Sequence, residues 1–111
     1  MTDRVGTPQL RPVEAFPARV GDREVICLRD PSGVTDAVLT VPRALAPILA
    51  LFDGVRSLVD VQAEIMRQCG ELVLRSQLES MVEILDQHLF LEGPRADAER
   101  ARQRAAFLDA P

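Results

Sequence analysis

The sequence predicts a small α+β domain in which antiparallel strands come first and helices follow. Between residues 12 and 42, short strand-like runs alternate with turn residues, which is typical of an antiparallel meander. After residue 42, apolar residues recur at helical spacing, and the segment 51–58 separates two of these patterns. The chain is therefore expected to form a three-stranded antiparallel sheet, then three helices and a further C-terminal helix.

Length and composition bound the class of protein. The 111 residues, 47% of them hydrophobic, suffice for one domain with a modest core. No apolar run approaches the ~18 residues of a membrane span, and residues 1–9 lack a signal peptide's apolar stretch, so a cytoplasmic location and no membrane contact are expected. A net charge of -4 and the absence of Trp and Tyr disfavour nucleic-acid binding.

The chain divides into three parts. Residues 1–10 are polar, contain Gly6 and Pro8, and are expected to form a flexible N-terminal arm. Residues 11–93 carry the strand and helix patterns of the domain. Residues 94–111 follow the Gly93-Pro94 break, are rich in good helix formers and are expected to form a C-terminal linker helix.

The first two strands are expected at residues 12–20 and 23–29. Pro17 cannot donate a ladder hydrogen bond, which predicts that the first strand lies at a sheet edge or a bulge. Gly21-Asp22 fits a two-residue hairpin turn between the strands, with Gly at the first central position of a type II′ turn.

A third strand is expected at residues 37–41. The turn sequence Asp30-Pro31-Ser32-Gly33 ends the second strand, with Pro at i+1 of a type I turn. Pro42 disfavours helical geometry at Val41, so the short apolar run before it is interpreted as a strand.

The turn between the first and second helices is the clearest local signal. The first helix is expected to begin near Ala44 or Ala46, because Pro47 would remove a backbone bond from an earlier start. Asp53-Gly54 is a turn dipeptide in which Gly can take a positive φ, and Ser57 is a good N-cap. The second helix should stop at Gly70.

The third helix has the strongest apolar pattern. Ser76 and Glu79 form a capping-box signature, which predicts a start at Ser76 and an end near Leu89. Its expected core stripe consists of Leu78, Val82, Leu85 and Leu89.

No catalytic constellation is found in the sequence, so an enzyme, a metal site and a cofactor are not expected. His88 is the single histidine and has no second metal ligand at a suitable spacing. Cys27 and Cys69 match neither a CxxC metal site nor a disulfide framework and are interpreted as buried structural thiols.

The third helix also has a second stripe of residues. Gln77, Met81, Ile84 and His88 lie about 60–120° to one side of Leu78 around the helix axis. One interpretation is a widened core face. The other is one wall of a groove whose opposite wall is a strand edge, where an extended segment could add as a strand.

The order and spacing of several short motifs resemble the PqqD-like domains, also called precursor-peptide recognition elements. The motifs are Asp53-Gly54-Val55-Arg56-Ser57-Leu58, Ile65 and Leu85-Asp86-Gln87-His88-Leu89-Phe90-Leu91. Arg11-Pro12-Val13-Glu14 and Ile26-Cys27-Leu28-Arg29-Asp30-Pro31 are similar to the N-terminal domain of the AmmeMemoRadiSam system protein B family. The resemblance covers roughly residues 10 to 95.

This resemblance implies a winged helix-turn-helix fold without catalysis of its own. In PqqD-like domains a leader peptide adds as a strand beside the third strand and lies against the third helix. The corresponding residues here are Val38, Leu39, Thr40, Val41, Gln77, Met81, Ile84 and His88. In the protein B family this domain precedes a Memo-like domain, and a radical SAM enzyme is encoded as a partner.

The leading hypothesis is therefore a non-catalytic adaptor that binds a peptide or protein by strand addition, with a radical SAM enzyme as the candidate partner. A second hypothesis is a DNA-binding winged-helix regulator, although Glu79, Glu83 and Asp86 on the third helix would face phosphates poorly. A third is a structural dimerisation domain of a larger Memo-like protein, so a homodimer remains open.

Overall fold

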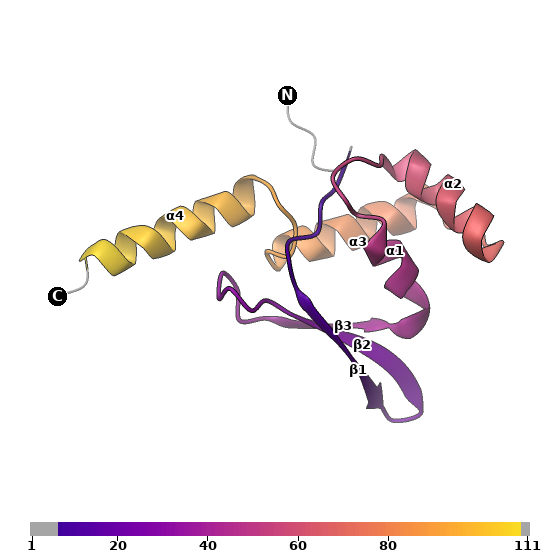
Figure 1. Cartoon of the computed structure of the whole chain (residues 1–111), viewed down its shortest axis with the longest axis horizontal. Coiled ribbons are helices and arrows are strands. Elements are labelled where there is room, and N and C mark those ends of the chain that lie inside the picture. The colour runs from indigo at the N-terminus through magenta and orange to yellow at the C-terminus, as the bar shows by residue number, and fades with distance from the viewer. Residues whose placement is uncertain (1–6, 110–111) are drawn as a thin grey trace.

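A computed structural model describes residues 7–109 of the chain. It contains three strands followed by four α-helices, which confirms the predicted α+β class (Figure 1). The elements are β1 (Glu14–Val20), β2 (Arg23–Arg29), β3 (Val38–Pro42), α1 (Ala46–Ala50), α2 (Leu58–Cys69), α3 (Arg75–Gln87) and α4 (Pro94–Asp109), with a 3-10 turn at Arg43–Leu45. Within the described range, no helix combines the length and the hydropathy that crossing a membrane requires.

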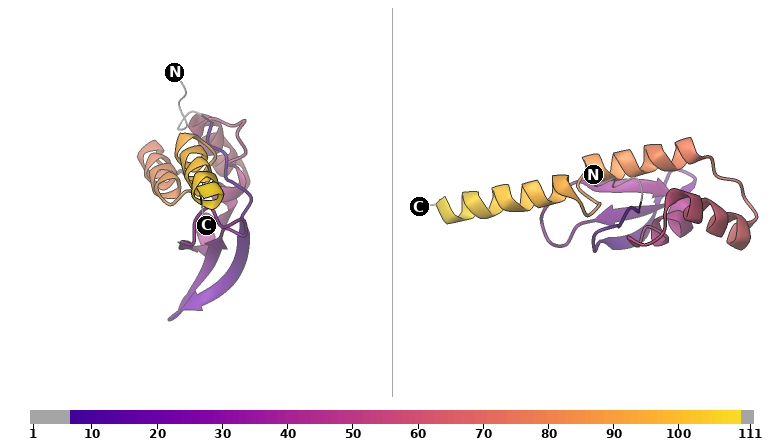
Figure 2. Two further views of the ribbon diagram at one scale, coloured as in Figure 1. Left: turned by 90° about the vertical axis from the view of Figure 1, so that its left-hand side faces the viewer. Right: turned by 90° about the horizontal axis from the view of Figure 1, so that it is seen from above.

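The strands form one antiparallel sheet in the order β1-β2-β3. All seven residues of β1 pair with β2, whereas β3 pairs with β2 over five residues. Pro17 lies in edge strand β1, as predicted, and Gly21 has a φ of 60° in the hairpin turn. The end of this hairpin extends away from the helices (Figures 1 and 2).

The hydrophobic core lies between the inner face of the sheet and helices α1, α2 and α3. Leu28 of β2 belongs to the same buried cluster as Val61 and Ile65 of α2. The predicted stripe of α3 is buried at Leu78, Val82 and Leu85. The prediction is wrong for the fourth residue, Leu89. Helix α3 ends at Gln87, and Leu89 lies outside it with a φ of 66°. The neighbouring Phe90 is fully buried instead.

Local capping explains where α2 begins and ends. The Ser57 hydroxyl accepts from the Asp60 amide at 3.2 Å, and the Asp60 carboxylate accepts from the Ser57 amide at 3.0 Å. Gly70 takes the left-handed conformation at the C-cap, with a φ of 69°. Both predictions for this helix are confirmed.

The predicted capping box at Ser76 is wrong. Helix α3 begins one residue earlier, at Arg75, with Leu74 as the N-cap residue. The side chain that folds back is that of Gln77, whose Oε1 accepts a hydrogen bond of 2.9 Å from the Leu74 amide. The Ser76 side chain therefore does not cap α3.

Residues 7–10, assigned from sequence to a flexible arm, are bound to the body of the domain. The Leu10 amide donates to the Phe52 carbonyl at 2.9 Å, and the Glu92 amide donates to the Gln9 carbonyl at 2.9 Å. Gly54 has a φ of 83°, and a Cβ there would lie 2.7 Å from Oε1 of Gln9. This segment therefore joins the helical turn to the end of α3, which corrects the expectation for these four residues; residues 1–6 lie outside the described range.

A buried ion pair fixes the loop between β2 and β3. The Arg11 guanidinium lies 3.1 Å from the carboxylate of Asp30, and both side chains are almost fully buried. Burial opposes ionisation of Asp30, but hydrogen bonds from Ser32, Thr35 and Arg11 lower its pKa from 3.8 to about 2. Arg11 also donates to the carbonyl of Leu89. One arginine thus links the start of the domain, the loop before β3 and the turn that follows α3.

Helix α4 extends away from the body of the domain (Figure 2). Its first half is docked: Ala96 is fully buried, and Arg95 lies 3.2 Å from the buried carboxylate of Asp86. Further along, the Gln103 side chain donates to the Val34 carbonyl at 3.0 Å. The predicted linker is therefore a helix that also contacts the loop before β3.

Candidate functional site

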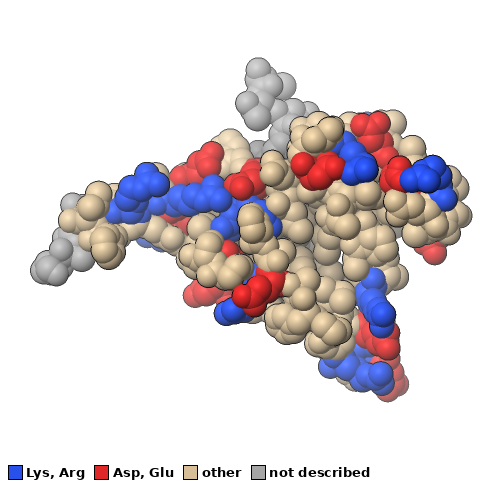
Figure 3. Space-filling model, in the orientation of Figure 1, with Lys and Arg blue, Asp and Glu red and all other residues tan. Residues whose placement is uncertain are grey.

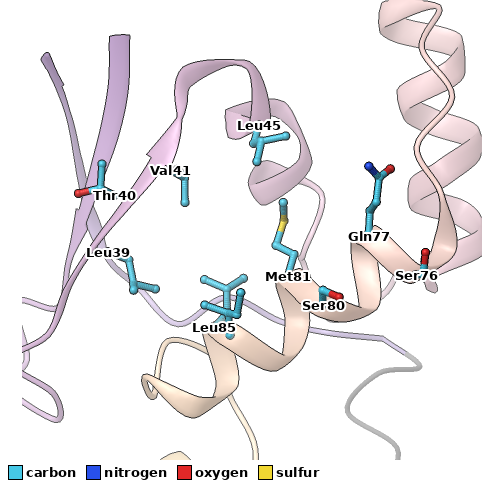
Figure 4. Close-up of a pocket in the computed structure, with 10 residues that line it drawn as sticks. Leu39, Thr40, Val41, Leu45, Ser76, Gln77, Ser80, Met81 and Leu85 are labelled. Carbon is cyan, nitrogen blue, oxygen red and sulfur yellow. The ribbon is translucent and has the colours of Figure 1, made fainter. Parts of the chain in front are cut away.

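An apolar groove of about 470 Å³ runs between β3 and α3 (Figure 4). Strand β3 and the following turn supply one wall, and α3 supplies the other. The lining residues are Leu39, Thr40, Val41, Leu45, Ser76, Gln77, Ser80, Met81, Ile84 and Leu85. In size the groove matches sites that hold small ligands or short peptide segments.

The wall on β3 is built by strand alternation. Leu39 lies opposite Leu28 in β2, and Val41 lies opposite Ile26, so these side chains share the sheet face that meets the helices. Both Leu39 and Val41 are half-buried and pack against the core. In the described part of the chain β3 pairs with β2 alone. Its outer edge therefore presents unpaired backbone groups directly beside the groove.

The wall on α3 follows helical periodicity. Leu85 is buried at the base of the groove, and Met81 is half-buried one turn earlier. Ile84, beside Leu85 on the same wall, is 51% exposed, so it presents apolar surface to solvent and to the groove. Towards the start of α3 the wall becomes polar, because Gln77, Ser76 and Ser80 replace apolar residues.

None of the ten lining side chains carries a formal charge. The charged residues of α3 are used elsewhere: Arg75 lies 3.4 Å from Glu79, and Glu83 lies 3.6 Å from Arg95 of α4. On the face drawn in Figure 3, charged side chains gather along α4, at the end of the β1–β2 hairpin and around α2. The groove thus offers apolar contact and neutral hydrogen-bonding groups, without a charge to neutralise an ionic ligand.

The structure brings together six of the eight residues predicted from sequence. Leu39, Thr40, Val41, Gln77, Met81 and Ile84 line the groove. Val38 is not among the lining residues and is 53% exposed. Thr40 shares the sheet face of Val38, and its side chain points away from the groove towards Cys27 of β2 (Figure 4). His88 does not line the groove either, because it is the C-cap residue and the helical stripe ends before it.

Four lining residues were missed in the sequence analysis. Leu85 was assigned to the core stripe, and it serves both the core and the base of the groove. Ser76 was assigned to a cap that does not form. Ser80 lies on the α3 turn between Ser76 and Ile84, so helical periodicity could have indicated it. Leu45 comes from the 3-10 turn after β3 and has no sequence signal of this kind.

The cysteines also differ from expectation. Cys69 is exposed at the end of α2, because it lies in the last turn, beyond the buried stripe of that helix. Cys27 is half-buried, with its Sγ 3.9 Å from the Thr40 hydroxyl. Within residues 7–109, no cluster of three or more His, Cys, Asp or Glu side chains has an arrangement that could hold a metal ion.

Comparison with known proteins gives one informative similarity. A MEMO1 family protein of Aquifex aeolicus (strain VF5) is 32% identical to this chain over 75 residues, which are 68% of this chain and 19% of the relative. The chain therefore spans about a fifth of the length of the curated relative that it matches. No family model matches the chain, and no solved structure matches it.

Proposed function

We propose that this chain is a non-catalytic module that binds an extended peptide or protein segment. The segment would add as a strand to the free edge of β3, and its alternate side chains would enter the groove against α3. The observation that carries this proposal is the uncharged, apolar groove lying directly beside an unpaired strand edge. Backbone hydrogen bonds would supply affinity, and the groove would supply selectivity.

The wider biological setting follows from two similarities. The motif order resembles PqqD-like domains, whose ligands are leader peptides bound at the corresponding strand and helix. The similarity to part of a longer MEMO1 family protein agrees with the protein B family, in which such a domain precedes a Memo-like domain. We therefore propose an adaptor role in a radical SAM-associated system, with a segment of the radical SAM enzyme as the ligand.

The sequence and the structure both weigh against duplex DNA as the ligand. The net charge is -4, and Glu79 and Glu83 are exposed or half-exposed along α3. Phosphates would meet these carboxylates if α3 entered a groove of DNA.

The proposal is tested by NMR titration of the isotope-labelled chain with overlapping synthetic peptides of the radical SAM enzyme. Binding should shift the amide signals of residues 38–42 and 76–85 together. Ile84→Asp should abolish the shifts, because it places a carboxylate in the apolar wall. Gln87→Asp is the matched control, since it adds the same charge to an exposed part of α3 outside the groove.

Two results would contradict the proposal. Peptide-induced shifts that survive Ile84→Asp would place binding elsewhere. Salt-sensitive shifts on α3 with duplex DNA, and none with any peptide, would support the DNA-binding alternative. Dimerisation through the β3 edge is the other alternative. It would appear as a mass that rises with protein concentration when the free chain is sedimented.

A further inference from the structure

The groove has three successive levels that differ in chemistry. The inner level consists of Leu39, Ile84 and Leu85. The middle level consists of Val41, Leu45 and Met81. The polar level consists of Ser76, Gln77 and Ser80. Along α3 the levels run from Leu85 through Met81 to Gln77, towards the start of the helix (Figure 4). Thr40 belongs to none of them, because its side chain points away from the groove.

The spacing of the levels matches that of side chains on a strand. Leu85, Met81 and Gln77 are each four residues apart, which is about 6 Å along a helix axis. Alternate residues of a strand are about 6.6 Å apart and point to the same face. A strand added beside β3 would therefore place consecutive inward side chains at consecutive levels.

The inner and middle levels contain only apolar side chains. An aspartate or glutamate entering either level would lose its hydration without finding a cation or a suitable donor. Lysine and arginine are disfavoured less strongly than aspartate and glutamate at these two levels, because their long stems can carry the charge out to solvent. Apolar side chains are thus favoured at both levels, and short acidic ones are strongly disfavoured.

The polar level instead favours ligand side chains that form hydrogen bonds. Ser76 and Ser80 offer two hydroxyl groups, and Gln77 offers an amide whose oxygen already accepts from the Leu74 backbone. An apolar ligand side chain pressed against these groups would displace water from them without replacing its hydrogen bonds. A hydroxyl or amide side chain would be accepted there.

We propose that the groove recognises a three-position pattern in its ligand. Two apolar side chains, separated by one residue, occupy the inner and middle levels. A neutral hydrogen-bonding side chain occupies the polar level at the next alternate position. This inference rests on the proposed function, because it assumes strand addition at β3, and it adds the class of segment that the groove selects.

The test is a selection from a random peptide display library against the immobilised chain, with the Ile84→Asp variant selected in parallel. Sequences enriched on the unaltered chain and absent from the variant depend on the groove. Among these, the three-position pattern should dominate, in either chain direction. Asp and Glu should be depleted at the two apolar positions but tolerated at the positions between them, which face away from the groove.

Synthetic peptides made from an enriched sequence then give the magnitudes. Asp in place of the middle-level residue should weaken binding by about 100-fold, whereas Asp at the adjacent outward position should change it by less than about 3-fold. Ser80→Ala should reduce the preference for a hydroxyl or amide at the third position by about 3- to 10-fold. It should leave the first two preferences unchanged.

The outcomes separate this inference from the proposed function. If no sequence depends on the groove, both are overturned. If sequences depend on the groove but lack the spacing, or carry Asp or Glu at the two apolar positions, only the pattern is overturned. An unchanged third-position preference in Ser80→Ala would also contradict the assignment of the polar level.

Discussion

The two edges of the sheet differ in what lies beside them. Edge strand β1 contains Pro17, which has no backbone donor, and the exposed charged residues Glu14 and Arg19. These features are typical of an edge protected against pairing with another chain. Edge strand β3 has no charged residue and borders an apolar groove. Strand β1 thus carries features that oppose pairing with another chain, and β3 lacks them, as the proposed strand addition at β3 requires.

The largest expected effect comes from removing the support of the β3 edge. Asp30→Asn should leave the Arg11 charge buried without its partner and lower the free energy of unfolding by about 3–5 kcal/mol. Chemical denaturation measures this change. The matched control is Glu14→Gln, which breaks the exposed β1–β2 pair with Arg29 and should cost less than about 1 kcal/mol. Equal losses would mean that Asp30 has no special role.

The next effect separates binding from stability. Ile84→Asp should weaken binding of a selected peptide by about 100-fold, equivalent to about 2.7 kcal/mol. It should change the unfolding free energy little, because Ile84 is 51% exposed. Ala18→Asp places the same group on edge strand β1 and should leave affinity unchanged. A comparable loss of affinity in Ala18→Asp would remove the distinction between the two edges.

A pH dependence should follow from Asp30. Its pKa is lowered to about 2 in the folded chain from an ordinary value of 3.8. The carboxylate therefore contributes stability that is present above pH 3.8 and is lost as the pH falls towards 2, by about 2 kcal/mol in all. Thermal unfolding measured across this range should show the loss. In Asp30→Asn the loss of stability between pH 3.8 and pH 2 should be smaller by this amount. An unchanged dependence of stability on pH would contradict the assignment of that loss to Asp30.

The smallest expected effect on stability concerns Pro17 and tests whether this residue protects the β1 edge. Pro17→Val restores a backbone donor on the exposed edge and should change stability by less than about 0.5 kcal/mol. It should, however, increase self-association at high protein concentration, because the edge is then able to pair. Sedimentation measures this change. If Pro17→Val remains as monodisperse as the unaltered chain, Pro17 does not protect the edge.

Local signals made much of this fold predictable. Gly54, Ser57 and Gly70 act through the backbone conformation or the capping of their own turn, so the sequence alone places them. The groove was also predictable in part. Met81 and Ile84 exceed what one core stripe of α3 needs, and a strand at residues 37–41 was expected beside them.

The missed features depend on contacts between distant segments. Arg11 and Asp30 are 19 residues apart, and no local pattern pairs them. Residues 7–10 carry no helix or strand pattern, yet the carbonyl of Phe52 and the amide of Glu92 hold them in place. His88 was placed in the groove because the helical pattern gives no sign that the chain turns at Leu89.

Amide hydrogen exchange with and without a selected peptide tests strand addition at β3, because it reports on both sheet edges in one experiment. Saturating peptide should slow exchange at residues 39–41 of β3 and leave exchange at residues 15–19 of β1 unchanged. Slowed exchange in β1, or binding with no added protection in β3, would contradict strand addition at the β3 edge.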